Sequence, residues 1–277
     1  MTNFAIDERF RGQVHRHLIG NLLAESTQSP LILGIFGPPG EGKTFQAQLA
    51  AEELGVEVRP IASSELESEN AAHPVQLLRR EYIAASARVD AGHPTVLVID
   101  DIDTAIGDWG AMVQYTVNRQ LVVSQLMAFC DFPNEVAGQR TRRVPVIVTG
   151  NRPEILYGPL RRPGRMRFFD WKPSAQTRAA LVVPLFENLP ADDVSQLVAD
   201  FPHRSVAFWS DVSALIWEDQ LEDWISKQSR PSLIEQLKGE YSMRLRGAAL
   251  SIADLRAAAE RLDGSARNDD ALIYGGN

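Results

Sequence analysis

The sequence predicts an α/β fold, in which helices sandwich a parallel β-sheet, followed by a small all-helical domain. Two observations lead to this prediction. In the first two thirds of the 277 residues, short apolar runs rich in β-branched residues alternate with helical patterns, as expected for strands buried on both faces of a parallel sheet. After Trp171, helical patterns continue with almost no strand pattern. The chain is 44 % hydrophobic and 23 % charged, ordinary globular values that exclude a disordered or collagen-like chain.

The expected strands are five apolar runs, the last of them the weakest, at residues 31–36, 56–61, 95–99, 144–149 and 166–171. The helices expected between them cover residues 44–54, 74–91 and 113–129. Strands that alternate with helices in this way predict a doubly wound domain of roughly 170 residues.

The expected boundary between the domains lies at Lys172-Pro173. We place the α/β domain, which begins with a short helix, at residues 1–172 and the helical domain at residues 173–263. The second domain is expected to contain helices at residues 174–186, 192–201, 210–226, 232–241 and 251–262, four of them beginning with a serine that can cap the helix. Residues 264–277 are rich in Gly, Asn and Asp, and we expect a disordered tail there.

Charge and cysteine content narrow the class of protein. With 28 basic and 36 acidic residues the net charge is −8, whereas nucleic-acid binding needs a basic face, so we expect no nucleic-acid partner unless a local basic patch exists. Cys130 is the single cysteine and cannot form an intrachain disulfide. Residues 1–11 are charged where a signal peptide is apolar, and no apolar run approaches the roughly 18 residues that span a bilayer. We therefore expect no membrane partner and a soluble protein of the cytoplasm or a stroma-like compartment.

A phosphate-binding motif follows the first expected strand directly and precedes a helix. The pattern G-x-x-x-x-G-K-[ST] is matched by Gly37, Pro38, Pro39, Gly40, Glu41, Gly42, Lys43 and Thr44. Its glycines let several backbone N–H groups point at a phosphate, and the helix dipole adds to the attraction. The lysine supplies charge to the β- and γ-phosphates of ATP, and the hydroxyl of Thr44 is a ligand for Mg²⁺. The alternative is a glycine-rich turn that binds nothing.

Carboxylates follow the strand expected at residues 95–99. Asp100 and Asp101 come directly after it, at the carboxyl edge of the sheet, where open α/β sheets bind ligands. We expect Asp100 to hold Mg²⁺ and Asp101 to orient or deprotonate the attacking water. Alone, the pair could equally cap a strand at a solvated edge.

Asn151 leaves the fourth expected strand at the same edge. Its amide is a candidate hydrogen-bond partner for the γ-phosphate or the attacking water. Because Gly-Asn sequences favour turns, a turn residue without a catalytic role is the alternative.

Four arginines gather within seven residues of a loop interrupted by Pro-Gly, at positions 161, 162, 165 and 167. Arginines on a tight loop are typical of an arginine finger, which stabilises the charge on a phosphoryl group held by a neighbouring subunit. An anion-binding patch or a nucleic-acid contact is the alternative.

Taken in order, these elements resemble the AAA+ ATPases, P-loop NTPases that carry a helical lid. Further strings resemble the Rubisco activases of plants and cyanobacteria and are more specific than the phosphate-binding motif. They lie at residues 64–71, 114–118, 143–151, 156–160 and 164–171. The resemblance spans roughly residues 10–226, and on it the chain is identified as a member of the Rubisco activase family.

The resemblance implies a homo-oligomeric ring, expected to be hexameric, with each ATP site at a subunit interface. It assigns phosphate binding to the motif at residues 37–44, Mg²⁺ binding to Asp100 and the role of catalytic base to Asp101. Asn151 would be the polar sensor, and Arg162 and Arg165 would act as fingers on the neighbouring subunit. Such a ring uses ATP to pull on inhibited Rubisco and release a tightly bound sugar phosphate.

The resemblance also extends to client-gripping segments and a lid residue. Residues 64–71 and 105–114 match the family's first two pore loops, although the second has an acidic residue and Trp109 where the family carries a positive charge. Trp109 could grip a client or anchor the loop by packing. Ser213 stands where the family has the second-sensor arginine.

These departures leave a second hypothesis open, in which the protein is an ATPase or a slow nucleotide switch that acts on a different protein client. A DNA-associated AAA+ protein is a third, which the charge of −8 disfavours.

Overall fold

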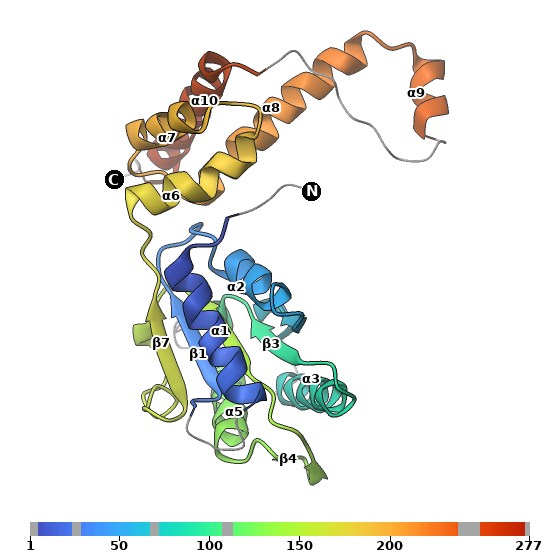
Figure 1. Cartoon of the computed structure of the whole chain (residues 1–277), viewed down its shortest axis with the longest axis vertical. Helices are drawn as coiled ribbons and strands as arrows, with labels where there is room; N and C mark the ends of the chain where they lie inside the picture. The colour runs from blue at the N-terminus through green and yellow to red at the C-terminus, as the bar shows by residue number, and fades with distance from the viewer. Residues whose placement is uncertain (1–4, 24–28, 67–71, 107–112, 238–249, 275–277) are drawn as a thin grey trace. The chain divides into compact units, whose positions relative to one another are not determined.

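Five strands form a parallel sheet in the order β2-β3-β6-β1-β7 (Figure 1). The strands are β1 (Ile32–Phe36), β2 (Glu57–Ile61), β3 (Thr95–Ile99), β6 (Val146–Gly150) and β7 (Met166–Asp170). The three central strands, β3, β6 and β1, are buried at every position, which explains their unbroken runs of apolar residues. The prediction of a parallel α/β sheet followed by a helical region is confirmed.

The computed structural model describes residues 5–23, 29–66, 72–106, 113–237 and 250–274. It divides into two compact units, one spanning Ile6–Lys172 and the other built from Pro173 onward. Within the ranges described, no helix is both long and apolar enough to cross a lipid bilayer.

The helices of the first unit are α1 (Glu8–Leu22), α2 (Lys43–Glu52), α3 (His73–Asp90), α4 (Ile102–Ile106) and α5 (Val113–Asp131). Short elements complete it: the 3₁₀ helices η1 (Ser63–Leu66) and η2 (Pro153–Ile155), and a hairpin of β4 (Glu135–Val136) and β5 (Gln139–Arg140). In Figure 1, α1 lies over one face of the sheet.

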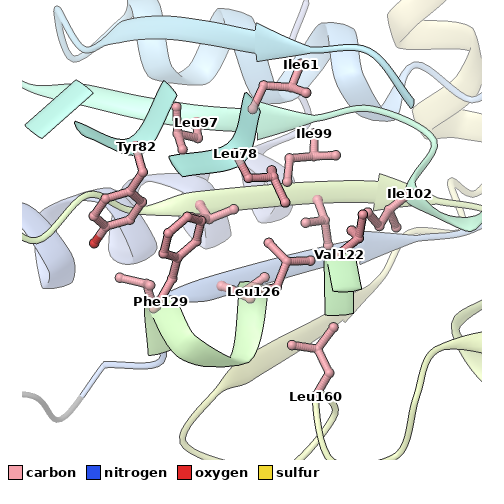
Figure 2. Packing of buried hydrophobic residues seen from close by; sticks show 14 of the residues in the cluster. Ile61, Leu78, Tyr82, Leu97, Ile99, Ile102, Val122, Leu126, Phe129 and Leu160 are labelled. Atoms are coloured by element: carbon pink, nitrogen blue, oxygen red, sulfur yellow. The ribbon is translucent and has the colours of Figure 1, made fainter. Parts of the chain in front are cut away.

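The main hydrophobic core packs α3 and α5 against the other face of the sheet (Figure 2). Tyr82 of α3 stacks on Phe129 of α5 with ring centroids 4.3 Å apart. Its hydroxyl donates to the carbonyl of Pro133 at 3.0 Å and accepts from the N–H of Val144 at 3.2 Å. The buried hydroxyl therefore has both partners, and it ties α3 to the chain entering β6.

Helix α1 is fixed to the sheet by a buried polar network. The His17 ring is 1 % exposed, and its Nε2 lies 3.0 Å from the carbonyl oxygen of Val146 in β6. Its Nδ1 faces the amide of Asn21, whose Oδ1 accepts from Arg143 at 2.8 Å. Burial lowers the pKa of His17 to about 3. This histidine is thus a neutral structural group.

The second unit contains α6 (Ala175–Val182), η3 (Val183–Phe186), α7 (Ala191–Asp200), α8 (Val206–Ser226), α9 (Arg230–Leu237) and α10 (Ile252–Tyr274). Its core centres on Trp209, which is fully buried and meets Phe201 and Phe208 edge-on. Ser174 caps α6 by accepting the N–H of Thr177 at 3.1 Å.

Helix boundaries differ from the sequence-based expectation, as α8 and α10 illustrate. Helix α8 begins at Val206 rather than at residue 210, because the hydroxyl of Ser205 caps it by accepting from Phe208. Helix α10 continues to Tyr274, whereas the sequence led us to end it at residue 262 and to expect a tail from residue 264. A single glycine such as Gly264 costs a helix only about 1 kcal/mol and does not have to end it.

Candidate nucleotide-binding site

The loop between β1 and α2, residues 37–44 (the P-loop), has a backbone that requires glycine. A Cβ on Gly37 would lie 1.9 Å from the carbonyl oxygen of Trp171, so no larger residue fits there. Gly40 and Gly42 have φ angles of 72° and 71°, in the left-handed region that favours glycine. The N–H of Gly37 donates to the carbonyl of Gly150 at 3.3 Å. The loop is therefore a preformed cradle of the kind that binds phosphate through backbone N–H groups.

Trp171 anchors the base of this loop. Its backbone N–H donates to the carbonyl of Phe36 at 2.6 Å, and its indole Nε1 donates to the carbonyl of Glu41 at 2.8 Å. Glu41 is buried, whereas Pro38 and Pro39 form the exposed tip. The motif did not indicate this role for Trp171, since it lies outside the pattern.

Lys43 lies at the centre of the site and is 7 % exposed. Its ammonium donates to the carbonyls of Gly37 at 3.0 Å and Pro38 at 2.9 Å, and to Oδ1 of Asn151 at 2.9 Å. Burial lowers the pKa of Lys43, and the nearby carboxylates, led by that of Asp101, oppose the shift. The lysine and Asn151, predicted from separate motifs, are thus in direct contact.

Three oxygen-bearing side chains meet beside the lysine. The Thr44 hydroxyl donates to Asp100 and lies 3.1 Å from the hydroxyl of Thr149, which itself donates to Asp100 at 2.5 Å. Hydroxyl and carboxylate oxygens are the ligands that Mg²⁺ prefers. This donor set fits the predicted Mg²⁺ ligands, Thr44 and Asp100. The sequence does not single out Thr149, because threonine inside an apolar strand is an ordinary strand residue.

These oxygens do not form a complete metal cage. In the described part of the chain, no group of three or more His, Cys, Asp or Glu side chains is arranged to hold a metal ion. A Mg²⁺ ion bound here would take its remaining ligands from nucleotide phosphates and water, as it usually does in phosphoryl-transfer enzymes.

Asp101 is half-buried and has an unusual backbone. Its φ of 46° is in the left-handed region, which non-glycine residues seldom adopt. The conformation is held by its N–H, which lies 3.0 Å from Oδ1 of Asp100 and 3.2 Å from the Thr149 hydroxyl. Burial raises the pKa of Asp101, and the charges of Asp100 and Asp103 raise it further, while Lys43 lowers it. A strained carboxylate of raised pKa is suited to the predicted role of base.

Asp103 is a site residue to which no sequence motif assigns a role. It lies on α4 and is 6 % exposed. Its Oδ2 accepts from the backbone N–H groups of Asn151 at 2.9 Å and Arg152 at 3.2 Å. The turn that carries the predicted sensor is therefore tied to the acidic segment after β3.

The predicted finger residues lie at the opposite end of the sheet. Arg165 directly precedes β7, and its carbonyl accepts from the N–H of Ile32 at the start of β1. Ile32 is the first residue of β1, and the P-loop begins five positions further on, about 16 Å away at 3.3 Å per residue and more than an arginine side chain spans. The structure thus gathers the P-loop, Asp100, Asp101 and Asn151, and keeps Arg165 apart from them.

The two predicted finger residues differ in their contacts. Arg165 forms a bidentate ion pair with Asp131, from Nε to Oδ1 at 2.9 Å and from Nη2 to Oδ2 at 2.7 Å. Its Nη1 donates to the carbonyl of Pro159 at 3.1 Å. Arg162 is exposed, and within the described ranges its guanidinium has no hydrogen-bond or ion-pair partner. Asp131 was not predicted, because its partner is distant in sequence.

Several predicted features lie wholly or partly outside the described residues. Of the first predicted pore loop, Ser64 to Leu66 belong to η1, and residues 67–71 lie outside the described residues. The same is true of residues 107–112 in the second predicted pore loop, which include Trp109.

Ser213, at the predicted second-sensor position, is described: it lies on α8 and is half-buried.

A glycine cradle between a buried strand and a helix, with a lysine, a threonine and strand-end carboxylates around it, defines a P-loop nucleotide-binding protein. The family of ATPases associated with various cellular activities (AAA) matches residues 33–173. The chain belongs to this AAA family, and membership of an ATPase family supports nucleotide binding and ATPase activity.

Within the AAA family, the chain is similar to curated Rubisco activases. The chain is 37 % identical over 235 residues to ribulose bisphosphate carboxylase/oxygenase activase 1, chloroplastic, of Nicotiana tabacum, covering 82 % of this chain and 53 % of the relative. It is 40 % identical over 233 residues to ribulose bisphosphate carboxylase/oxygenase activase of Anabaena sp. (strain CA / ATCC 33047), covering 80 % of this chain and 56 % of the relative. The resemblance to Rubisco activases is confirmed, and the chain spans about half the length of these relatives.

Proposed function

We propose that this protein is an ATP-dependent remodelling motor of Rubisco-activase type, which hydrolyses ATP at the interfaces of a homo-oligomeric ring. The observation that carries the proposal is the division of the site. The P-loop, Asp100, Asp101 and Asn151 meet at the carboxyl edge of the sheet, while the arginine loop lies at the far end of the same strands. In a head-to-tail contact each copy would complete the site of one neighbour, and such contacts form a ring where the rotation between copies closes.

The residues of one copy would bind and orient ATP. The backbone N–H groups of the P-loop and the Lys43 ammonium would hold the β- and γ-phosphates. Thr44 and Asp100 would hold Mg²⁺, which supplies charge neutralisation at the phosphates when bound. Asp101 would orient and deprotonate the attacking water, and Asn151 would contact the γ-phosphate or that water.

The neighbouring copy would contribute Arg162, whose guanidinium is exposed and unengaged in the described part of the chain. A positive charge brought to the γ-phosphate stabilises the charge that develops on it during transfer. Arg165 would support the same loop from within its own chain through Asp131. The resemblance to Rubisco activases supports six subunits.

The similarity to Rubisco activases supports Rubisco as the protein client and the release of inhibitory sugar phosphates as the outcome. We propose a cytoplasmic or stroma-like location on the same basis. Ser213, at the position of the second-sensor arginine, favours a second candidate function. Without that charge the protein could bind ATP and hydrolyse it slowly, as a switch acting on a different client.

Steady-state ATP hydrolysis by the wild type, Asp101→Asn and Asp90→Asn tests the enzymatic part. Asp90 is a matched control, since it is exposed at the end of α3 and pairs with Arg142 on the surface. We expect turnover in the wild type and the control and a loss of at least about 100-fold in Asp101→Asn. A wild type without turnover would rule out the motor.

Recovery of carboxylation by inhibited Rubisco tests the client. We expect recovery with ATP and none with a non-hydrolysable ATP analogue. Equal recovery with both nucleotides would contradict a motor, and ATP hydrolysis without any recovery would favour a different client.

A further inference from the structure

Asp103 is a buried carboxylate to which the proposed mechanism assigns no task. It belongs to the first turn of α4, three residues after Asp100, and is 6 % exposed. A buried carboxylate is costly unless it is hydrogen-bonded, so its partners indicate what it holds in place. Among the described residues, the partners of its Oδ2 are two backbone N–H groups of the turn after β6, those of Asn151 and Arg152.

The packing around Asp103 brings it against the end of β6. A Cβ added to Gly150 would lie 2.8 Å from Oδ1 of Asp103 and 2.8 Å from a ring carbon of Phe36. Glycine at this position therefore lets the carboxylate approach the turn closely. Oδ1 has no hydrogen-bond partner among the described residues, so the contacts of Oδ2 are what holds the carboxylate here.

A continuous chain of hydrogen bonds leads from Asp103 to the P-loop. Oδ2 of Asp103 accepts from the N–H of Asn151, Oδ1 of Asn151 accepts from the Lys43 ammonium, and that ammonium also donates to Gly37. Because the backbone of Asn151 is fixed by a charged acceptor, its carboxamide stays beside the lysine. Hydrogen bonds to charged acceptors are stronger than bonds between neutral groups, so the carboxylate can hold the turn at Asn151 in one position.

We propose that Asp103 is a positioning residue: it holds the turn at Asn151 so that the side chain of Asn151 can read the γ-phosphate, and thereby sets the preference for ATP over ADP. The inference rests on the proposed function, because it takes the γ-phosphate as the group that Asn151 contacts. Asp103 itself would not touch the nucleotide.

The test compares Asp103→Ala, Asp103→Asn, Asn151→Ala and the double variant Asp103→Ala/Asn151→Ala, with Asp90→Asn as control. The affinities for ADP and for a non-hydrolysable ATP analogue are measured together with kcat. Asp103→Ala should lose about tenfold or more in kcat and in the preference for the ATP analogue, with ADP affinity unchanged. Asp103→Asn keeps a neutral acceptor and should lose less.

The double variant decides whether Asp103 acts through Asn151. If it does, Asp103→Ala should cost nothing further once Asn151 is alanine, since coupled residues are not additive. Additive losses in kcat and in ATP preference, or an equal loss of affinity for ADP and for the ATP analogue, would overturn the proposal. Asp103 would then be a structural residue.

Amide hydrogen exchange separates this inference from the proposed function. Removing the carboxylate should speed hydrogen exchange at the N–H groups of Asn151 and Arg152. This exchange can be measured without any bound nucleotide. A wild type that binds neither nucleotide would contradict the proposed function, and unchanged exchange in Asp103→Ala would overturn the role of Asp103 in holding the turn.

Discussion

The Lys43 ammonium donates a 2.9 Å hydrogen bond to Oδ1 of Asn151, although the two residues are 108 positions apart in the chain. One begins α2 and the other follows β6, and the pairing of β1 with β6 brings them together. The group proposed to bind phosphate is thus in contact with the group proposed to sense it.

Replacing Asn151 by alanine should slow hydrolysis more than it weakens binding. The P-loop and Lys43 remain to bind the β-phosphate, so KM for ATP should rise by no more than about tenfold, through the lost contact with the γ-phosphate. We expect kcat to fall about 100-fold, because the contact matters most in the transition state. Steady-state kinetics measure both parameters, and a raised KM with an unchanged kcat would show that Asn151 serves ground-state binding instead.

The Gly37→Ala substitution should destabilise the first unit. The new Cβ would lie 1.9 Å from the carbonyl oxygen of Trp171, and displacing that backbone should cost on the order of 3 kcal/mol. The matched control is Gly158→Ala, where a Cβ meets nothing within 4 Å. Urea denaturation should show a lower unfolding free energy for the first variant only, and equal stabilities would contradict the close approach.

Substitutions at the arginine loop should affect either ATP hydrolysis or stability, depending on the residue that is changed. Arg162→Ala should reduce hydrolysis by about 10³-fold, in the range seen for arginine fingers, without changing the unfolding free energy. Asp131→Asn should weaken the ion pair with Arg165, which is partly exposed, and so cost at most about 1 kcal/mol of stability. The reverse pattern, with Arg162 affecting stability and not turnover, would remove it from the site.

His17 should make the protein sensitive to mild acid. Its pKa is about 3 in the folded state and close to 6.5 in an unfolded chain. Between these values the unfolded state binds a proton that the folded state does not, so stability falls as the pH falls through 6.5.

Urea denaturation of the wild type and His17→Asn at about pH 7.5 and about pH 5 measures this effect. The stability advantage of the wild type should shrink by about 2 kcal/mol at the lower pH. An advantage that is the same at both pH values would mean that His17 does not stay neutral.

Much of the candidate site could be predicted because parallel strands end at one edge of the sheet. The P-loop, Asp100 and Asn151 each follow a buried strand, and each strand is recognisable as a short apolar run. Local pattern and topology were enough to place these residues together.

The remaining residues depend on contacts that no local pattern carries. Thr149 occupies a strand position where threonine is ordinary, and it is its approach to Asp100 that gives it a role. Asp103 depends on Gly150 leaving room for its carboxylate, and Asp131 on a loop that folds back to it. Such contacts arise from packing in three dimensions, so the sequence did not reveal them.

Mixing two inactive variants tests the central claim, that one copy completes the ATP site of its neighbour. Asp101→Asn retains Arg162, and Arg162→Ala retains Asp101, so a mixed assembly would contain interfaces with both residues intact. Random mixing of equal amounts should restore hydrolysis at about a quarter of the interfaces, because the contact is head-to-tail. A mixture no more active than either variant alone would contradict a shared site.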